Sequence, residues 1–197
     1  MSEDHSKTRR TIALGLGATA ASALIPEAAW AQREDRDTYS EPEIIRAAED
    51  FFGAAAEGLA NVIHHVFNDK GRPNGYITGD EGSGAIGIGL RYGGGRLHLK
   101  RNMGVTPVYW QGPSIGFDTG GNGSKVFTLV YHMTDPSRIF QRFPGVDGSA
   151  YFIGGFGANY QQSGRIILAP IRAGVGFRLG ANIGYLNYSR HRRLNPF

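Results

Sequence analysis

The sequence predicts a mainly β fold: a small antiparallel β-barrel of about eight strands, with one N-terminal amphipathic helix and a short helix near residues 135–143. Three observations support this prediction. The 197 residues include 30 glycines, about twice the ordinary usage of roughly 7%. Between Gly75 and Tyr188, apolar residues alternate with glycines and polar residues, and a period of two places the two sets on opposite faces of a strand. Gly, Asn, Asp or Pro separates the runs, as tight turns between antiparallel strands require.

The first 31 residues have the features of an export signal. A basic start precedes a mildly apolar run over residues 11–25, and Ala29–Ala31 is a small-x-small cleavage site. The pair Arg9 and Arg10 resembles a twin-arginine signal, and the alternative is an ordinary secretory signal. The apolar run is shorter than the roughly 20 apolar residues that span a bilayer. We therefore expect cleavage after Ala31 and a mature protein that lies outside the cytoplasm and is not integral to a membrane.

A helix is predicted after a flexible leader of residues 32–39, at the start of a single domain over residues 40–197. Ser40 is a typical N-cap residue, and Glu43 stands three residues later to complete a capping box. Apolar residues then recur at helical spacing as far as Val66. The pattern predicts one amphipathic helix over residues 40–67, whose apolar stripe packs on the β body.

The remaining elements follow from the same kind of local signal. Asp135 is placed to cap a short helix that Pro144 and Gly145 end. Short strands joined by tight turns favour a sheet that is closed, or nearly closed, into a barrel. The predicted strands are residues 75–80, 84–92, 95–101, 106–111, 114–119, 125–132, 149–160, 165–173 and 175–188.

The charged residues are distributed unevenly along the chain. The formal net charge is +4, yet no acidic residue follows Asp147, and arginines supply all the charge beyond it. From Gly164 to Tyr188, one parity carries apolar side chains and the other carries mainly glycine and arginine. A face of this kind suits an anionic partner, or it is simply a solvated surface.

Two orientations of this glycine and arginine face stay open. If it lines the barrel, the glycines leave room for a ligand, and the guanidinium groups bind phosphate or carboxylate. If it faces solvent, the apolar parity is an ordinary core and the glycines only permit strong curvature. The candidate ligand-binding residues of the first orientation are Arg91, Tyr109, Trp110, Asp118, Arg172 and Arg178.

Catalytic and metal-binding patterns are weak in this sequence. There is no cysteine, and the adjacent His64 and His65 would point about a hundred degrees apart on a helix. Residues 82–87 match a dinucleotide-binding pattern but lead into a predicted strand, whereas that motif needs a helix. Ser114 lies in a Gly-x-Ser-x-Gly pattern, so a hydrolase is an alternative, although a strand end and a turn follow it. We expect a non-enzyme with no metal, no cofactor and no nucleic-acid partner.

An outer-membrane barrel is a further alternative, because about eight strands and a terminal Phe197 are also typical of that class. Lys100, Arg101 and Pro170 interrupt the bands that would face lipid, and the chain ends in a basic, proline-containing segment. A twin-arginine route exports folded proteins. These features favour a barrel that is not inserted in a bilayer.

Several longer runs are specific enough to compare with known families. They are residues 73–77 (PNGYI), 81–85 (EGSGA), 89–93 (GLRYG), 109–116 (YWQGPSIG), 141–151 (QRFPGVDGSAY) and 195–197 (NPF). Over essentially the whole mature chain, these runs resemble the EipA-type envelope-integrity proteins of alphaproteobacteria. The resemblance implies a periplasmic protein with a small β-barrel, a basic interior cavity and no known catalytic activity, which helps to maintain the cell envelope. A weaker and partial similarity, over residues 89–94 and 112–157, is to the SYLF lipid-binding domains.

The sequence and this resemblance together predict a non-enzymatic periplasmic protein that supports envelope integrity. Its expected ligand is an anionic or amphipathic envelope component, a lipid or a glycan, bound in the barrel. The alternative is an interaction scaffold that contacts envelope proteins through the helix of residues 40–67 and carries no small ligand.

Overall fold

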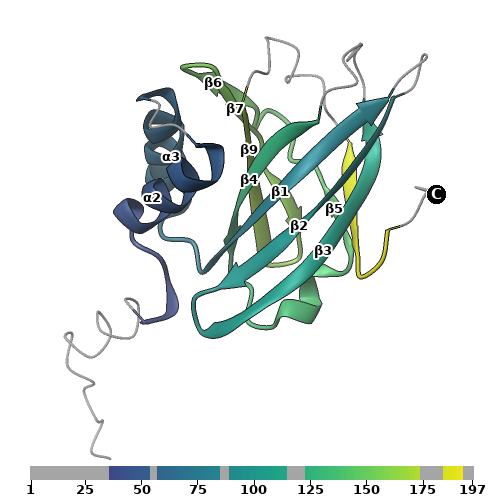
Figure 1. Cartoon of the computed structure of the whole chain (residues 1–197), viewed down its shortest axis with the longest axis horizontal. Helices are drawn as coiled ribbons and strands as arrows, with labels where there is room; N and C mark the ends of the chain where they lie inside the picture. The colour runs from purple at the N-terminus through teal and green to yellow at the C-terminus, as the bar shows by residue number, and fades with distance from the viewer. Residues whose placement is uncertain (1–35, 54–56, 85–88, 115–122, 174–183, 193–197) are drawn as a thin grey trace, which may run out of the picture.

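The computed structural model describes residues 36–53, 57–84, 89–114, 123–173 and 184–192 (Figure 1). The predicted export signal and the first half of the leader, residues 32–35, therefore lie outside the described residues. Two helices, α2 (Glu41–Phe52) and α3 (Glu57–Lys70), come first. The elements that follow are β1 (Gly75–Gly84), β2 (Gly89–Leu99), β3 (Asn102–Ser114), β4 (Ser124–Tyr131), the 3₁₀ helix η1 (Pro136–Ile139), β5 (Arg142–Pro144), β6 (Tyr151–Ile153), β7 (Phe156–Ala158), β8 (Gln161–Ser163), β9 (Ile166–Ala173) and β10 (Tyr185–Ser189).

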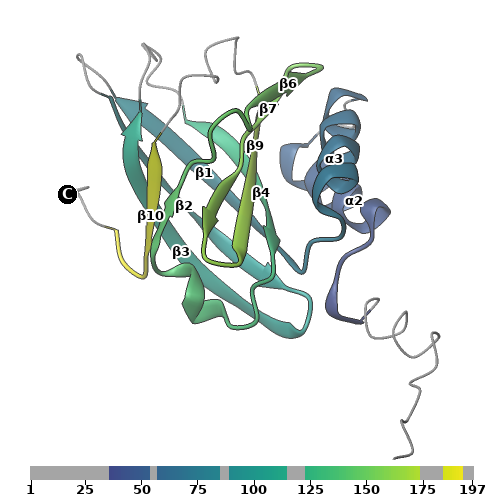
Figure 2. The same cartoon turned by 180° about the vertical axis from the view of Figure 1, so that it is seen from behind.

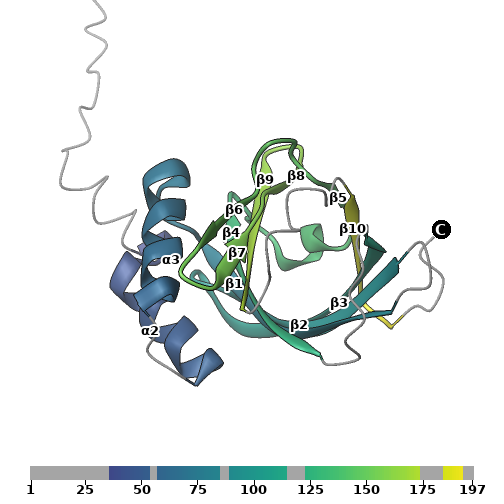
Figure 3. The ribbon, with the colours of Figure 1, turned by 90° about the horizontal axis from the view of Figure 1, so that it is seen from above.

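The described strands form one antiparallel sheet that curves into a barrel-like shape. Its hydrogen-bonded order is β5-β10-β3-β2-β1-β4-β9-β7-β6, and β8 also pairs with β9. The rear view of the molecule in Figure 2 shows β10, and the view from above in Figure 3 shows the strands arranged as a ring. An isolated bridge joins Gly145, just after β5, to Gln161 of β8, so the two sides of the sheet approach each other. The predicted fold class, a small antiparallel barrel, is confirmed, with ten strands in the described residues.

The predicted single helix is two helices. Its start is as predicted, because the Glu43 carboxylate accepts a hydrogen bond from the Ser40 backbone N–H at 2.8 Å. Gly53 then takes a left-handed conformation, with φ of 77°, and ends α2. A glycine in that conformation at the end of a helix is the commonest stop signal, and the apolar spacing alone did not reveal it.

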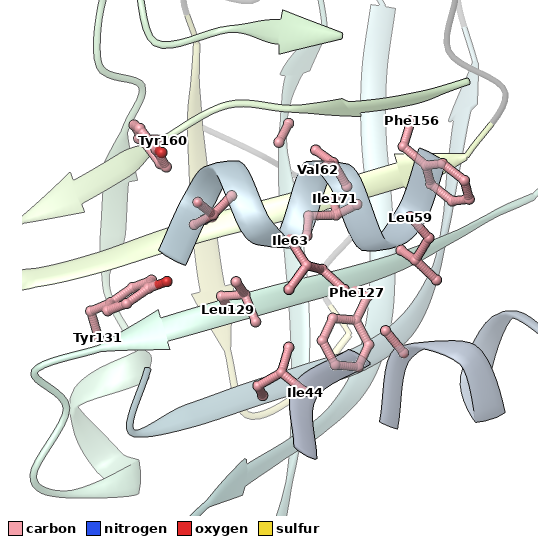
Figure 4. Close-up of a cluster of buried hydrophobic side chains, with 14 residues drawn as sticks. Ile44, Leu59, Val62, Ile63, Phe127, Leu129, Tyr131, Phe156, Tyr160 and Ile171 are labelled. Carbon is pink, nitrogen blue, oxygen red and sulfur yellow. The ribbon is translucent and has the colours of Figure 1, made fainter. Parts of the chain in front are cut away.

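The apolar faces of α2 and α3 pack on the outward face of β4 and β9, as the stripe predicts. Ile44, Leu59 and Ile63 meet Phe127 there, and all four side chains are fully buried (Figure 4). A lipid-facing barrel would need this outward face to be free, and in the structure the two helices occupy it.

The short helix also differs from its prediction. Asp135 caps it, accepting a hydrogen bond from the Ser137 N–H at 2.7 Å, but it ends at Ile139 instead of continuing to residue 143. Residues 142–144 form β5, which pairs with β10 and buries Phe143. Figure 3 shows the short helix inside the ring of strands, so η1 covers one end of the barrel.

The predicted break between strands near residues 93–95 does not occur. β2 runs through three consecutive glycines, and it pairs with β1 and β3 along its length. The reason is a close approach: a Cβ atom on Gly93 would lie only 2.1 Å from the ring of Trp110. Gly93 is therefore a site where an indole packs against bare backbone, whereas a Cβ atom on Gly94 would meet the Tyr109 ring and one on Gly95 would meet the backbone of Thr78.

Candidate functional site

A buried carboxylate, Glu81 of β1, organises the charged interior of the barrel. Its side chain is only 5% exposed. Arg172 donates to it from Nε at 2.9 Å and from Nη2 at 3.3 Å, and Arg91 approaches with Nε at 3.2 Å. The indole N–H of Trp110 donates to the same carboxylate at 2.8 Å. We call Glu81, Arg91, Arg172 and Trp110 the Glu81 network.

The register of the sheet explains how four strands supply this network. Side chains alternate between the two faces, and Ile77 and Glu81 of β1 share one parity. Ile77 belongs to the apolar cluster inside the barrel, so Glu81 points inward as well. On β9, Arg172 shares its parity with Leu168 of the same cluster, whereas Ile171 packs under the helices. Alternate residues of β9 therefore point to opposite faces of the sheet, and Arg172 points into the barrel.

This placement resolves the orientation that the sequence left open, for the residues that the structure describes. Arg172 is 3% exposed, and its Nη1 also donates to the Asn159 side chain at 3.1 Å. Arg91 is more accessible, at 13% exposure. The network lies toward the end of the barrel where β1, β3 and β9 finish and β2 and β4 begin, and η1 lies at the other end (Figure 1).

Three inward-facing glycines in the described strands do not leave the empty space that the sequence suggested. Gly79, Gly93 and Gly95 face inward, but Cβ atoms there would meet Trp110 or neighbouring backbone at less than 3 Å. The cluster around Ile77, Leu97 and Phe143 fills the barrel between this level and η1. A ligand that reaches the arginines would have to approach from the end where Arg91 is partly exposed.

Opposing effects set the ionisation of Glu81. Burial alone would raise the pKa of its carboxyl group. The charges of Arg172 and Arg91, with hydrogen bonds from Arg172 and Trp110, outweigh this effect and hold the pKa below its ordinary value of 4.5. Burial also raises the pKa of Tyr188, which packs beside Trp110 with its ring 5.8 Å away. The interior therefore holds an ionised carboxylate among neutral aromatic rings.

Acidification is expected to weaken the fold through Glu81. Because its pKa is lower in the folded state, its stabilising contribution is present above the unfolded value and is lost as the pH falls through the folded value. Urea-unfolding free energies should therefore decrease below about pH 4.5. Glu43 titrates in the same direction, because a hydrogen bond from Lys100 lowers its pKa to about 2, so Glu43→Gln is the control. That variant should keep most of the acid dependence, and a Glu81→Gln variant with an unchanged acid profile would contradict the assignment.

The predicted ligand-binding residues do not all meet at one place. Arg91, Arg172 and Trp110 join the network, whereas Tyr109 points to the outer face of the sheet. Neighbouring residues in a strand point to opposite faces, so the Tyr109 side chain does not reach the Glu81 network, although both Tyr109 and Trp110 line one hollow at the sheet surface. The other two candidates, Asp118 and Arg178, lie outside the described residues.

Glu81 was missed because it follows Gly79 and precedes Gly82, in a segment that reads as a turn. The signal that was available is its parity. An acidic residue four positions after Ile77, on the inward face of an extended β1, is unusual unless it has a buried partner.

The hydrolase alternative finds little support in the described residues. Ser114 is the last residue of β3, and the residues after it lie outside the described part. His132 follows the far end of β4, and His191 follows the far end of β10, so both are a strand length away. Within the described segments, no group of histidine and acidic side chains is arranged to hold a metal ion. The helices in those segments are too short or too polar to cross a membrane.

A curved antiparallel sheet, with an ion-pair network inside and two helices on one outer face, places the chain among small barrel-like β proteins. It belongs to the EipA family, that of envelope integrity protein A, which matches residues 37–197. A solved structure from Brucella abortus, described as a β-barrel-like, uncharacterized protein, is 47% identical, with a TM-score of 0.74. That match covers 82% of this chain and 99% of the Brucella chain. No curated protein matches the chain.

Proposed function

We propose that the protein supports envelope integrity from the periplasm by binding an anionic or amphipathic envelope component, a lipid or a glycan, without catalysis. Residues 1–31 serve as its export signal, with cleavage after Ala31. The family supports the envelope role. The observation that carries the binding proposal is the pair of arginines, Arg91 and Arg172, held inside one end of the barrel by Glu81.

The two arginines have different parts in this proposal. Arg172 donates hydrogen bonds to the side chains of Glu81 and Asn159. It therefore holds the Glu81 carboxylate in place, and we assign it a positioning role. Arg91 is the more exposed of the pair and contacts Glu81 through Nε. A guanidinium group can form bidentate contacts with a phosphate or carboxylate, and Arg91 is the one of the two that solvent reaches. Low solvent exposure strengthens such a contact because water competes less for the charges.

Arg91→Ala is expected to remove the bound component while leaving the fold in place. The test is native mass spectrometry of protein purified from its own periplasm, with intact masses read for residues 32–197. The unmodified protein should carry an adduct that Arg91→Ala loses by about tenfold or more, which corresponds to one charged contact. Circular dichroism melting shows whether the variant is folded.

Arg165→Ala is the matched control, because Arg165 is an exposed arginine in the turn between β8 and β9. It should keep the adduct. An unmodified protein that carries no adduct would contradict the binding proposal and favour the interaction scaffold, as would an adduct that survives in Arg91→Ala.

A further inference from the structure

The outer face of β1, β2 and β3 carries a groove, whose smaller part is also lined by Glu81 and Trp110. It consists of two adjoining hollows of about 310 and 620 Å³, a size typical of small-molecule sites. Both hollows are lined by Asp80, Gly94, Tyr109 and Arg192, so they form one continuous surface. We call it the outer groove.

The strand register arranges the outer groove in rows across the sheet. One row pairs Thr78, Arg96 and Pro107, and the next pairs Asp80, Gly94 and Tyr109. The side chains in these rows have the opposite parity to those of Glu81 and Trp110, so they point away from the Glu81 network, to the other face of the same strands. Figure 1 shows β1, β2 and β3 side by side, with α2 beyond β1.

Glycines make the floor of the outer groove and an aromatic ring lies on it. A Cβ atom on Gly82 would meet nothing within 4 Å, so the missing side chain leaves open space there. Tyr109 is half-buried, and its ring lies about 3.1 Å from the Cβ position of Gly94. Phe51 of α2 is among the residues that line the larger hollow, and the Arg192 guanidinium lies 6.0 Å from the Tyr109 ring.

The polar side chains around this ring carry both charges. Asp80, Arg96 and Arg192 are exposed. A carboxylate accepts hydrogen bonds from neighbouring hydroxyl groups, and a guanidinium binds a carboxylate or phosphate. An aromatic ring beside them offers a flat apolar surface. A sugar ring, with an apolar C–H face and hydroxyl groups at its edge, has the complementary chemistry, whereas an acyl chain would leave these polar groups without partners.

We propose that the outer groove binds an acidic oligosaccharide, with a sugar ring on Tyr109, hydroxyl groups on Asp80, and an acidic substituent on Arg96 or Arg192. This site goes beyond the interior arginines, and it does not depend on them.

The test compares two soluble probes by NMR titration of the ¹⁵N-labelled mature protein. Chitotetraose is a neutral amino-sugar chain, and a hyaluronan tetrasaccharide alternates an amino sugar with a uronic acid. Saturable shifts are expected for the backbone amides of Thr78, Asp80, Gly94 and Tyr109 with the hyaluronan tetrasaccharide. Chitotetraose should bind about tenfold more weakly, because it lacks the acidic groups for the arginines.

Two variants decide whether the groove itself is responsible. Gly82→Val projects a side chain into the open space, where its Cβ atom would meet nothing within 4 Å, and should abolish the shifts while the protein stays folded. Tyr109→Leu should weaken binding by about tenfold. Phe152→Ala is the control, because Phe152 is an exposed aromatic residue on β6, away from the groove.

Three results would overturn the proposal: no saturable shift with either probe, equal binding of both probes, or unchanged binding in Gly82→Val. Binding of phosphatidylglycerol vesicles that Gly82→Val abolishes, without oligosaccharide binding, would assign the groove to a lipid surface instead. Loss of oligosaccharide binding in Arg91→Ala, but not in Gly82→Val, would place the ligand in the interior.

Discussion

Glu81→Gln is expected to destabilise the protein by about 3–5 kcal/mol, because it leaves two arginines inside the barrel without their shared carboxylate. The buried position is what makes the effect large. Arg172 and Glu81 are 3% and 5% exposed, so water cannot replace the lost partner. Urea denaturation at pH 7, followed by tryptophan fluorescence and circular dichroism, measures the change.

The control is an ion pair of the same kind at the surface. Arg101 and Asp37 are in contact at 3.1 Å, but the arginine is 72% exposed. Asp37→Asn should therefore cost less than about 1 kcal/mol. If Glu81→Gln were as mild as Asp37→Asn, Glu81 would not be the counter-ion that fixes the interior arginines, and the positioning part assigned to Arg172 would be wrong.

Local signals predicted the parts of this fold that depend on local physics. The capping box at Ser40 and the alternation along β4 and β9 were readable, because a helix start and a strand face are set by residues close in sequence. The same alternation showed that Ile171 and Arg172 have opposite environments. It did not show which of them faces the barrel, because that depends on where the helices pack.

The candidate site was predictable only in part, for a related reason. Arg91, Trp110 and Arg172 were identified as charged or polar residues on a glycine-rich face, but their common partner was not. Glu81 meets them through pairings between strands that are up to 91 residues apart in sequence. No local pattern reports such a contact. The glycines at 93–95 were predicted to break the strand, whereas Gly93 allows the Trp110 ring to approach the backbone. A glycine that ends a strand and a glycine that permits a close approach look alike in sequence.

The close approach of the Trp110 ring to Gly93 predicts a second large effect on stability. Gly93→Ala is expected to destabilise the protein by about 3 kcal/mol, in the upper part of the range for an overpacked core. The new methyl group would lie 2.1 Å from the Trp110 ring, and the ring cannot move away easily, because it is buried and its N–H donates to Glu81. Thermal and urea unfolding measure the loss.

Gly82→Ala is the control for Gly93→Ala, because it shows how much a strand glycine costs to replace with alanine when no aromatic ring lies against it. Gly82 lies on β1, one residue from the Gly93 pairing position, but its Cβ would face the open outer groove. Alanine there should be neutral, or stabilising by up to about 1 kcal/mol, because it restricts the unfolded chain. In a double-mutant cycle, Gly93→Ala should destabilise the Trp110→Leu variant by at least about 1 kcal/mol less than it destabilises the unmodified protein, because the ring that clashes with the new methyl group is gone. Strictly additive effects would mean that the glycine serves the backbone alone and that the indole does not depend on it.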